Sequence, residues 1–313
     1  MSLLHALVLG ITQGLAEFLP ISSSGHLRLV PWFFGWDDFS GRPELELAFD
    51  VSLHIGTLAG AIAYFRRDLV RLARGGVLAL RARRGGALAN APASGSGTEG
   101  TTETSAAPAG SAGSAAGTAL DPLDDGRLAW LLLASAVPAA VTGALLSDAV
   151  ARLGKVEWTI GVLLVVFGLV LLWADRLGGT RGAETFGLRA AVAMGTAQAL
   201  ALAPGVSRSG ATITTGRWLG FSRDAAARLS FLMSLPITGG AVLYEMVGLI
   251  GDGGLPEGFV AAMGVGIAAS AATGWLAVWG TLHLVRTMPF RPFVVYRVVA
   301  GVGVILLAAT GLR

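Results

Sequence analysis

Long apolar segments recur along this chain of 313 residues, and they limit the folds it can adopt more than any other feature does. A helix needs about 20 apolar residues to cross the hydrocarbon core of a bilayer. Four or five segments meet this requirement well: 47–65, 128–146, 157–174, 258–282 and 293–311. A further segment, 225–250, is long enough but is interrupted by Pro236. We therefore expect an all-α, polytopic membrane protein.

The charge content favours the same class. Charged residues make up 14% of the chain and hydrophobic residues 53%, whereas soluble domains contain about 25% charged residues. Cysteine is absent, which excludes disulfides, thiolate metal sites and cysteine nucleophiles. The pI near 9.9 is explained by arginine-rich loops on the cytoplasmic side of a membrane protein, so we expect no nucleic-acid partner.

Two other apolar segments, 3–19 and 189–203, end early in the polar sequences PISSSGHL and PGVSRSG. Irregular backbone at membrane depth is tolerated only where it is buried in protein or lines a cavity. A shift of 185 residues places 10–27 over 195–212 without a gap, and seven of the 18 positions are then identical. The two polar breaks therefore belong to an internal repeat.

The loop charges predict how the chain is threaded. Residues 66–84 carry a net charge of +6 from seven Arg and one Asp, 36–46 carry −3, and 283–297 hold three Arg and no acid. Basic loops face the cytoplasm. The segments expected inside are 66–127, 175–189 and 283–292, and those expected outside are 147–157 and 251–257.

This threading gives the two halves opposite orientation. Residues 1–35 enter and leave the membrane from the outside, and 189–224 enter and leave from the inside. We predict two inverted-topology repeats, each with a re-entrant broken helix, an arrangement that often builds a binding site near the midplane. The predicted parts are 1–84 (re-entrant hairpin and first spans of the first repeat), 85–120 (a flexible, low-complexity cytoplasmic loop), 121–188 (two transmembrane helices completing that repeat) and 189–313 (the second repeat with its own hairpin).

Arg208 stands in the second break, where an arginine costs at least about 2.5–3.5 kcal/mol if it lies at mid-bilayer. Its guanidinium matches the geometry of phosphate or carboxylate. Ser207, Ser209 and Thr212 surround it in sequence, and the N-terminus of the following helix favours anions. This set predicts a phosphate-binding site. The alternative is that Arg208 only pairs with Glu17 and pins the two hairpins together.

The first break offers complementary groups. Gln13 and Glu17 are four residues apart and share a helix face, and Ser22, Ser23, Ser24 and His26 follow. At least one of the three serines is expected to cap a helix. A carboxylate, hydroxyls and a histidine can supply a nucleophile, a general base and an acid. Glu17 can also hold a divalent cation, with Mg²⁺ or Ca²⁺ preferred by oxygen ligands.

These residues resemble a known family, the undecaprenyl-diphosphate phosphatases of the bacitracin-resistance family. Its signatures E/Q-x-x-x-E and PGxSRSxxT match Gln13 to Glu17 and Pro204 to Thr212, and FDVSLHIGTL (49–58) and LSFLMSLP (229–236) are also similar to it. The resemblance covers nearly the whole chain except 85–120. Many members have a glutamate where this chain has Gln13, which cannot ionise.

The resemblance implies an integral membrane hydrolase that converts a long-chain isoprenyl diphosphate to the monophosphate and inorganic phosphate, recycling the lipid carrier of cell-wall synthesis. It implies a multi-pass protein of the bacterial plasma membrane, a divalent cation and a site open to the extracytoplasmic side, and it is compatible with a homodimer. The implied catalytic residues are Ser23 as nucleophile, His26 as acid or base, Glu17 as metal ligand or base, and Arg208 as phosphate clamp. The implied substrate-binding residues are Gln13, Ser22, Ser24, Gly205, Ser207, Ser209 and Thr212.

Two alternatives stay open on sequence grounds. Ser23 attacks the terminal phosphorus in one mechanism, and an activated water attacks directly in the other, with Ser23 only binding phosphate. A transporter or flippase of prenyl phosphates is the alternative function, since inverted repeats with broken helices are typical of secondary transporters. A transporter needs the phosphate clamp but no nucleophile.

Overall fold

A computed structural model describes residues 1–89, 122–153, 156–249 and 258–311. The described residues form ten α-helices and one short 3-10 turn, η1, at Ala183–Thr185, without any β-strand. The predicted all-α class is confirmed. The helices are α1 (Leu3–Phe18), α2 (Ser23–Phe34), α3 (Pro43–Ala89), α4 (Pro122–Leu153), α5 (Glu157–Arg176), α6 (Leu188–Leu200), α7 (Arg208–Trp218), α8 (Arg223–Leu249), α9 (Phe259–Thr287) and α10 (Arg291–Thr310).

Six of these helices, α3, α4, α5, α8, α9 and α10, are long and apolar enough to cross a membrane. They coincide with the six apolar segments identified in the sequence. The first span is longer than predicted, because α3 continues from Pro43 through the arginine-rich stretch to Ala89. Residues 85–89 of the predicted loop are therefore helical, and the rest of that loop, 90–120, lies outside the described residues.

The expected interruption at Pro236 does not occur, because α8 runs continuously through it. Proline removes one backbone donor from a helix, and membrane helices accept this loss when neighbouring groups bind the freed carbonyls. The carbonyl that Pro236 frees is that of Leu232, four residues earlier, and Arg208 of α7 contacts the same stretch of α8 at the Ser234 carbonyl (3.5 Å) and the Thr238 hydroxyl. The sixth predicted span is thus an intact helix.

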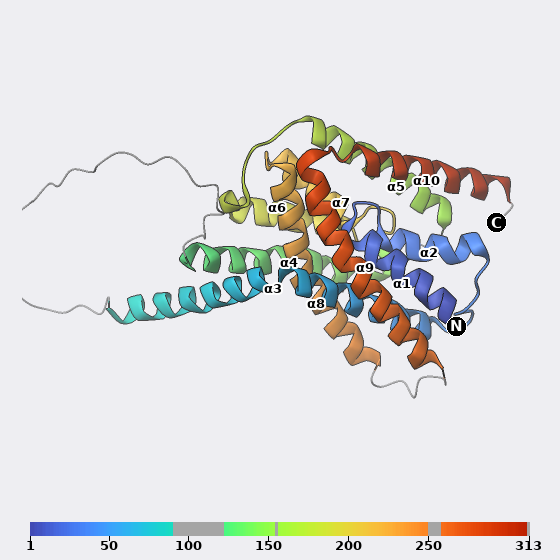
Figure 1. Cartoon of the computed structure of the whole chain (residues 1–313), viewed down its shortest axis with the longest axis horizontal. Coiled ribbons are helices and arrows are strands. Elements are labelled where there is room, and N and C mark those ends of the chain that lie inside the picture. The colour runs from blue at the N-terminus through green and yellow to red at the C-terminus, as the bar shows by residue number, and fades with distance from the viewer. Residues whose placement is uncertain (90–121, 154–155, 250–257, 312–313) are drawn as a thin grey trace, which may run out of the picture.

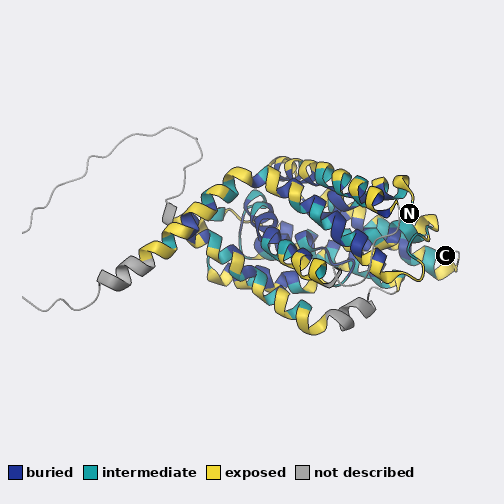
Figure 2. Cartoon of the chain, turned by 90° about the horizontal axis from the view of Figure 1, so that it is seen from below, coloured by how far each residue is buried: buried dark blue, intermediate teal, exposed yellow. Residues whose placement is uncertain are grey.

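The outer surface of the bundle is largely apolar. Figure 2 shows buried residues along the inner faces of the helices and exposed residues along the outer faces. Many of the exposed side chains are large and hydrophobic, including Leu243, Val247 and Val299, which are 67%, 75% and 68% exposed. A soluble protein rarely exposes such contiguous apolar surface, so these faces suit contact with lipid.

Two short helix pairs, α1–α2 and α6–α7, lie among the long helices. In Figure 1, α1 runs from the N-terminal end toward the middle of the molecule and α2 returns to the same end. Glycines let both pairs approach their neighbours closely: a Cβ at Gly10 would lie 2.7 Å from the Gly266 carbonyl oxygen, and one at Gly195 would lie 2.3 Å from that of Ser135. Gly10 and Gly195 occupy the same position in the sequence repeat.

The ten described helices can be divided into two sets, α1–α5 and α6–α10, in which α1 corresponds to α6, α2 to α7 and so on. Most contacts between the sets are then reciprocal: where a helix of the first set packs against one of the second, their counterparts also pack together. Helix α1 packs against α9, while α6, its counterpart in the second set, packs against α4. Likewise α3 contacts α9 while α8 contacts α4, and the counterparts α5 and α10 pack against each other. This exchange brings the α1–α2 and α6–α7 breaks together in the interior.

Candidate active site

Each break ends in a serine with a backbone conformation that is rare outside glycine. Ser22 (φ 81°) and Ser207 (φ 74°) are the only non-glycine residues of the described chain with positive φ. Ser22 Oγ accepts from the Gly25 N–H at 3.4 Å to cap α2, and Ser207 Oγ accepts from the Gly210 N–H at 3.1 Å to cap α7. The prediction that one of the serines caps a helix is confirmed. Such unfavourable backbone persists where its surroundings impose it, and it clusters at functional sites.

The two breaks are tied to each other directly. Ser22 Oγ also accepts from the Gly205 N–H at 3.0 Å, and Ser209 Oγ donates to the Leu19 carbonyl at 3.1 Å. Gly205 has φ 101°, and a Cβ there would lie 2.8 Å from the Ile160 carbonyl oxygen of α5. Glycine is required at this position both for its conformation and for the close approach.

Arg297 of α10 joins the breaks from a third side. The sequence places Arg297 among the charges of a basic loop. The structure places it inside α10, where it is fully buried. Its guanidinium donates to the five carbonyls of Pro20, Leu163, Leu164, Gly205 and Val206 at 2.9–3.4 Å. These carbonyls belong to the first break, to α5 and to the second break. Arg297 therefore satisfies backbone acceptors that the breaks would otherwise leave unpaired in the interior.

Glu17 lies at the centre of the site. Its Oε2 accepts from Ser23 Oγ at 2.5 Å and from Gln13 Nε2 at 3.2 Å, and its Oε1 accepts from Arg208 Nη2 at 2.5 Å. Ser23 is the first residue of α2, and Arg208 is the first residue of α7. One carboxylate thus connects the predicted nucleophile to the predicted phosphate clamp.

Arg208 extends into the interior of the bundle but stays partly exposed. Its side chain is 20% exposed, against 6% for Glu17. Besides Glu17, its guanidinium contacts the Ser234 carbonyl and the Thr238 hydroxyl of α8. The pairing with Glu17 that was considered as a purely structural alternative exists, and the partial exposure leaves the cation within reach of a ligand.

His26 is held by both ring nitrogens. Nδ1 lies 2.7 Å from the Ser22 carbonyl and Nε2 lies 2.7 Å from the Tyr296 hydroxyl. Because a carbonyl only accepts, Nδ1 carries a proton, and Nε2 of the neutral ring accepts from the tyrosine. His26 and Ser23 are three residues apart on α2, but the group that contacts the Ser23 hydroxyl is Glu17.

The remaining predicted site residues are placed as follows. Thr212 is buried and bonds to Ser230 at 2.6 Å. Ser207 and Ser209 hydroxyls lie 3.3 Å apart beside the start of α7. Ser24 is exposed near the start of α2. Gln13 is fully buried, and its Oε1 has no hydrogen-bond partner among the described residues. A role of these groups in binding substrate stays a prediction.

Sequence reasoning missed Arg297, Tyr296 and Thr238. An arginine in an apolar segment was the signal that identified Arg208, and Arg297 gives the same signal near the start of the last span. Tyr296 and Thr238 carry no comparable signal, because a hydroxyl in a membrane helix is common. Only the packing of α8 and α10 against the breaks identifies them.

The donor set fits a divalent cation only if a ligand completes it. Glu17 and the unpaired amide oxygen of Gln13 are adjacent oxygen donors. No group of three or more His, Cys, Asp or Glu side chains suited to a metal occurs in the described ranges. Mg²⁺ is commonly bound by one or two protein oxygens together with substrate phosphates and water. The residues therefore suit a cation that arrives with a phosphorylated substrate.

Comparisons with known proteins identify the family. A family model described as "Bacitracin resistance protein BacA" matches residues 6–303. A protein of Geobacter metallireducens named "Undecaprenyl-diphosphatase" is 41% identical over 308 residues, which cover 98% of each chain. Proteins with the same name from Geobacter sulfurreducens and a Nocardioides species are 42% and 38% identical, and each alignment covers at least 96% of both chains.

Proposed function

This chain belongs to the bacitracin resistance protein BacA family, and we propose that it is an integral membrane phosphatase that hydrolyses undecaprenyl diphosphate to undecaprenyl phosphate and inorganic phosphate. The reaction recycles the lipid carrier for peptidoglycan synthesis and confers resistance to bacitracin. The named relatives and the six apolar helices support this function.

One observation supports the chemistry most strongly. Ser23, Glu17 and Arg208 form a continuous hydrogen-bonded set that draws on both breaks. A hydroxyl bonded to a carboxylate is the arrangement of a nucleophile and its base, and a neighbouring guanidinium matches the oxygens of a phosphoryl group. Phosphoryl transfer depends chiefly on positioning and charge stabilisation, which this set supplies.

In the mechanism we favour, Ser23 Oγ attacks the terminal phosphorus as its proton passes to Glu17 Oε2. The bond from that phosphorus to the bridging oxygen breaks, and undecaprenyl phosphate leaves with the bonding electrons. Glu17 gives its proton to the departing undecaprenyl phosphate and is again a carboxylate. A water molecule then loses a proton to Glu17 and attacks the phosphoserine; the bond from phosphorus to Ser23 Oγ breaks, inorganic phosphate is released, and Ser23 Oγ takes the proton from Glu17. Arg208 neutralises charge on the transferring phosphoryl group in both steps.

His26 takes no part in the proton transfer from Ser23 to Glu17. Its bond from Tyr296 fixes the ring, and we assign it the exchange of a proton with the phosphate groups rather than the activation of Ser23, which contacts Glu17. Glu17 and Gln13 are the residues that would hold Mg²⁺ or Ca²⁺. When bound, such a cation would offset diphosphate charge as a Lewis acid.

The finer topology is part of the proposal. We infer two inverted repeats, α1–α5 and α6–α10, whose short helix pairs are re-entrant. The reciprocal helix contacts and the matching serine caps support this inference. With the loop charges, it gives a protein of the bacterial inner membrane whose site opens to the extracytoplasmic side. A homodimer stays a prediction that the mass of the purified particle would test.

Phosphate release from undecaprenyl diphosphate tests the function. Ser23→Ala should lower the rate at least about 10²-fold, since a covalent nucleophile is lost. Thr196→Ala is the matched control, because it removes an exposed hydroxyl from α6 that bonds only to its own helix. A wild-type rate in Ser23→Ala would remove Ser23 from the mechanism. Tight binding of the lipid by the wild-type protein without phosphate release would instead favour a transporter.

A further inference from the structure

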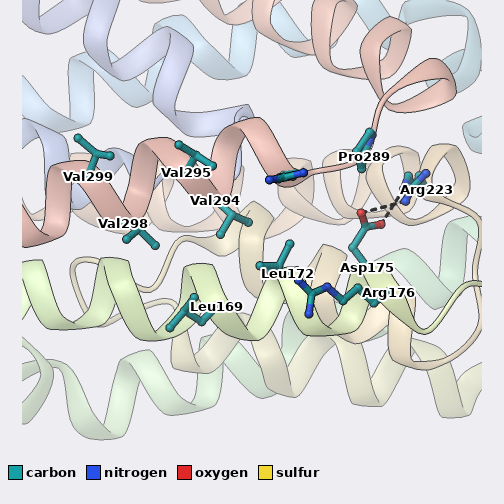
Figure 3. A pocket seen from close by; sticks show the side chains of 11 residues that line it. Leu169, Leu172, Asp175, Arg176, Arg223, Pro289, Val294, Val295, Val298 and Val299 are labelled. Carbon is teal, nitrogen blue, oxygen red and sulfur yellow. Dashed lines mark hydrogen bonds and ion pairs between the residues drawn. The ribbon is translucent and has the colours of Figure 1, made fainter.

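A pocket lies between α5 and α10. Its volume is about 550 Å³, and its walls are apolar. In Figure 3, Val294 and Val298 of α10 face Leu169 and Leu172 of α5 along its length. None of the residues that line it belongs to the site around Glu17.

One end of this pocket is polar and basic. Arg176 ends α5, Arg291 begins α10, and Arg223 and Asp175 complete the rim. Three arginines and one aspartate give this rim a net charge of +2. The pocket is therefore amphipathic, with an apolar cleft that leads to a cluster of cations.

Of the three arginines at the rim, only Arg223 forms an ion pair within the described residues. Asp175 accepts from Nε and Nη2 of Arg223, at 2.6 and 3.0 Å, and it also contacts Arg217 at 3.3 Å. Arg176 and Arg291 are exposed and make no ion pair or hydrogen bond with the parts of the chain that the structure describes. These two arginines are available to an anion from outside the protein.

We propose that this pocket binds an anionic phospholipid of the bilayer, with its phosphate between Arg176 and Arg291 and an acyl chain along the apolar cleft. The rim lies at the end of the molecule where the basic loops predict the cytoplasmic face, and basic pockets between transmembrane helices on that face suit anionic headgroups. Charge complementarity and the continuous apolar wall select this occupant over a soluble anion, which would use only the rim.

The proposal is tested by titrating purified protein in detergent with phosphatidylglycerol and with phosphatidylcholine, and counting bound lipids by native mass spectrometry. The variant is Arg176→Gln with Arg291→Gln. Its matched control is Arg74→Gln with Arg81→Gln, which removes the same charge from exposed positions of α3 on the same side. A wild-type circular dichroism spectrum and a wild-type elution volume in size-exclusion chromatography show that both variants are folded, so the outcome is independent of the proposed enzymatic function.

We expect the wild-type protein and the control to bind phosphatidylglycerol more tightly than phosphatidylcholine. The pocket variant should bind phosphatidylglycerol at least about tenfold more weakly, since each arginine near an anionic surface contributes about fivefold and two together contribute up to about thirtyfold. An equal loss in the control, or equal affinity of the wild type for both lipids, would overturn the proposal. Full displacement of the lipid by an equal concentration of glycerol phosphate would also overturn it, because the apolar cleft would then contribute nothing.

Discussion

At the scale of single residues, two arginines in apolar surroundings have different tasks. Arg208 is partly exposed and pairs with the Glu17 carboxylate, so it can turn to a phosphate. Arg297 is fully buried and binds only backbone carbonyls. Sequence alone identifies an arginine in an apolar segment as significant, but it does not distinguish a ligand-binding arginine from one that holds the backbone. That distinction depends on the carbonyls that the folded breaks present.

Replacing Arg297 by lysine should destabilise the protein. The ammonium keeps the charge but cannot reach five carbonyls from three segments. We expect a loss of at least about 2 kcal/mol in the free energy of unfolding, the cost of leaving one or two buried acceptors unpaired. Unfolding in detergent followed by circular dichroism measures it. Arg189→Lys, an exposed replacement on α6, is the control, and equal stability of the two variants would refute the role of Arg297.

Glu17→Gln should abolish most of the activity, because the amide cannot accept the Ser23 proton. General base catalysis contributes about 10²–10⁴-fold, and kcat should fall by that range. Glu46→Gln removes an exposed carboxylate from α3 and serves as the control. If Glu17→Gln kept more than a tenth of the wild-type kcat, another group would have to be the base.

Tyr296→Phe tests the support of His26. Loss of the hydroxyl that donates to Nε2 removes one neutral hydrogen bond, so kcat/KM should fall about tenfold. The decrease should not add to that of His26→Ala, since both changes disable one unit. Tyr244→Phe, at a side chain that is 83% exposed, gives the baseline. If the losses in kcat/KM of Tyr296→Phe and His26→Ala multiplied in the double variant, Tyr296 would not act through His26.

At the scale of elements, the helix breaks were foreseeable from sequence and their geometry was not. Pro, Gly and Ser after apolar runs predicted breaks near residues 20 and 204, and Ser22 and Ser207 cap the returning helices there. The continuity of α8 through Pro236 was not foreseeable, because it depends on its neighbours. The same holds for the length of α3, whose basic stretch looked like a loop by composition.

Gly205→Ala should distort the second break. The new Cβ would meet the Ile160 carbonyl oxygen at 2.8 Å and also occupy a left-handed conformation. Gly41→Ala isolates the conformational part, since Gly41 has φ 70° with open space around it. That part costs about 1–2 kcal/mol. We expect Gly205→Ala to lower both the unfolding temperature and phosphate release well below Gly41→Ala, and similar behaviour of the two would show that the contact with α5 is unimportant.

At the scale of the whole molecule, the two halves complete each other. Each short helix pair packs on a long helix of the other half, and the site contains residues from α1, α2, α7, α8 and α10. The sequence predicts a repeat, because the break residues recur at a spacing of 185. The exchange of packing partners was not detectable, because the apolar faces of the long helices carry no distinguishing pattern.

The threading makes a prediction for the intact cell. The chain has no cysteine, so single cysteines report their own location. Ser40→Cys and Thr180→Cys both introduce a thiol at exposed positions, one before α3 and one after α5. A membrane-impermeant maleimide added to intact cells should label Ser40→Cys and not Thr180→Cys, and permeabilised cells should show both labelled. The reverse pattern would place the active site on the cytoplasmic side.

The central claim is that the two breaks form a single active site. It is tested most directly by a double-mutant cycle on phosphate release, with Ser23→Ala, Arg208→Ala and the double variant. Residues that act as a unit give strongly non-additive losses, so the double variant should be about as slow as the slower single variant. Losses in kcat/KM that multiply, or a wild-type rate in either single variant, would contradict a shared site.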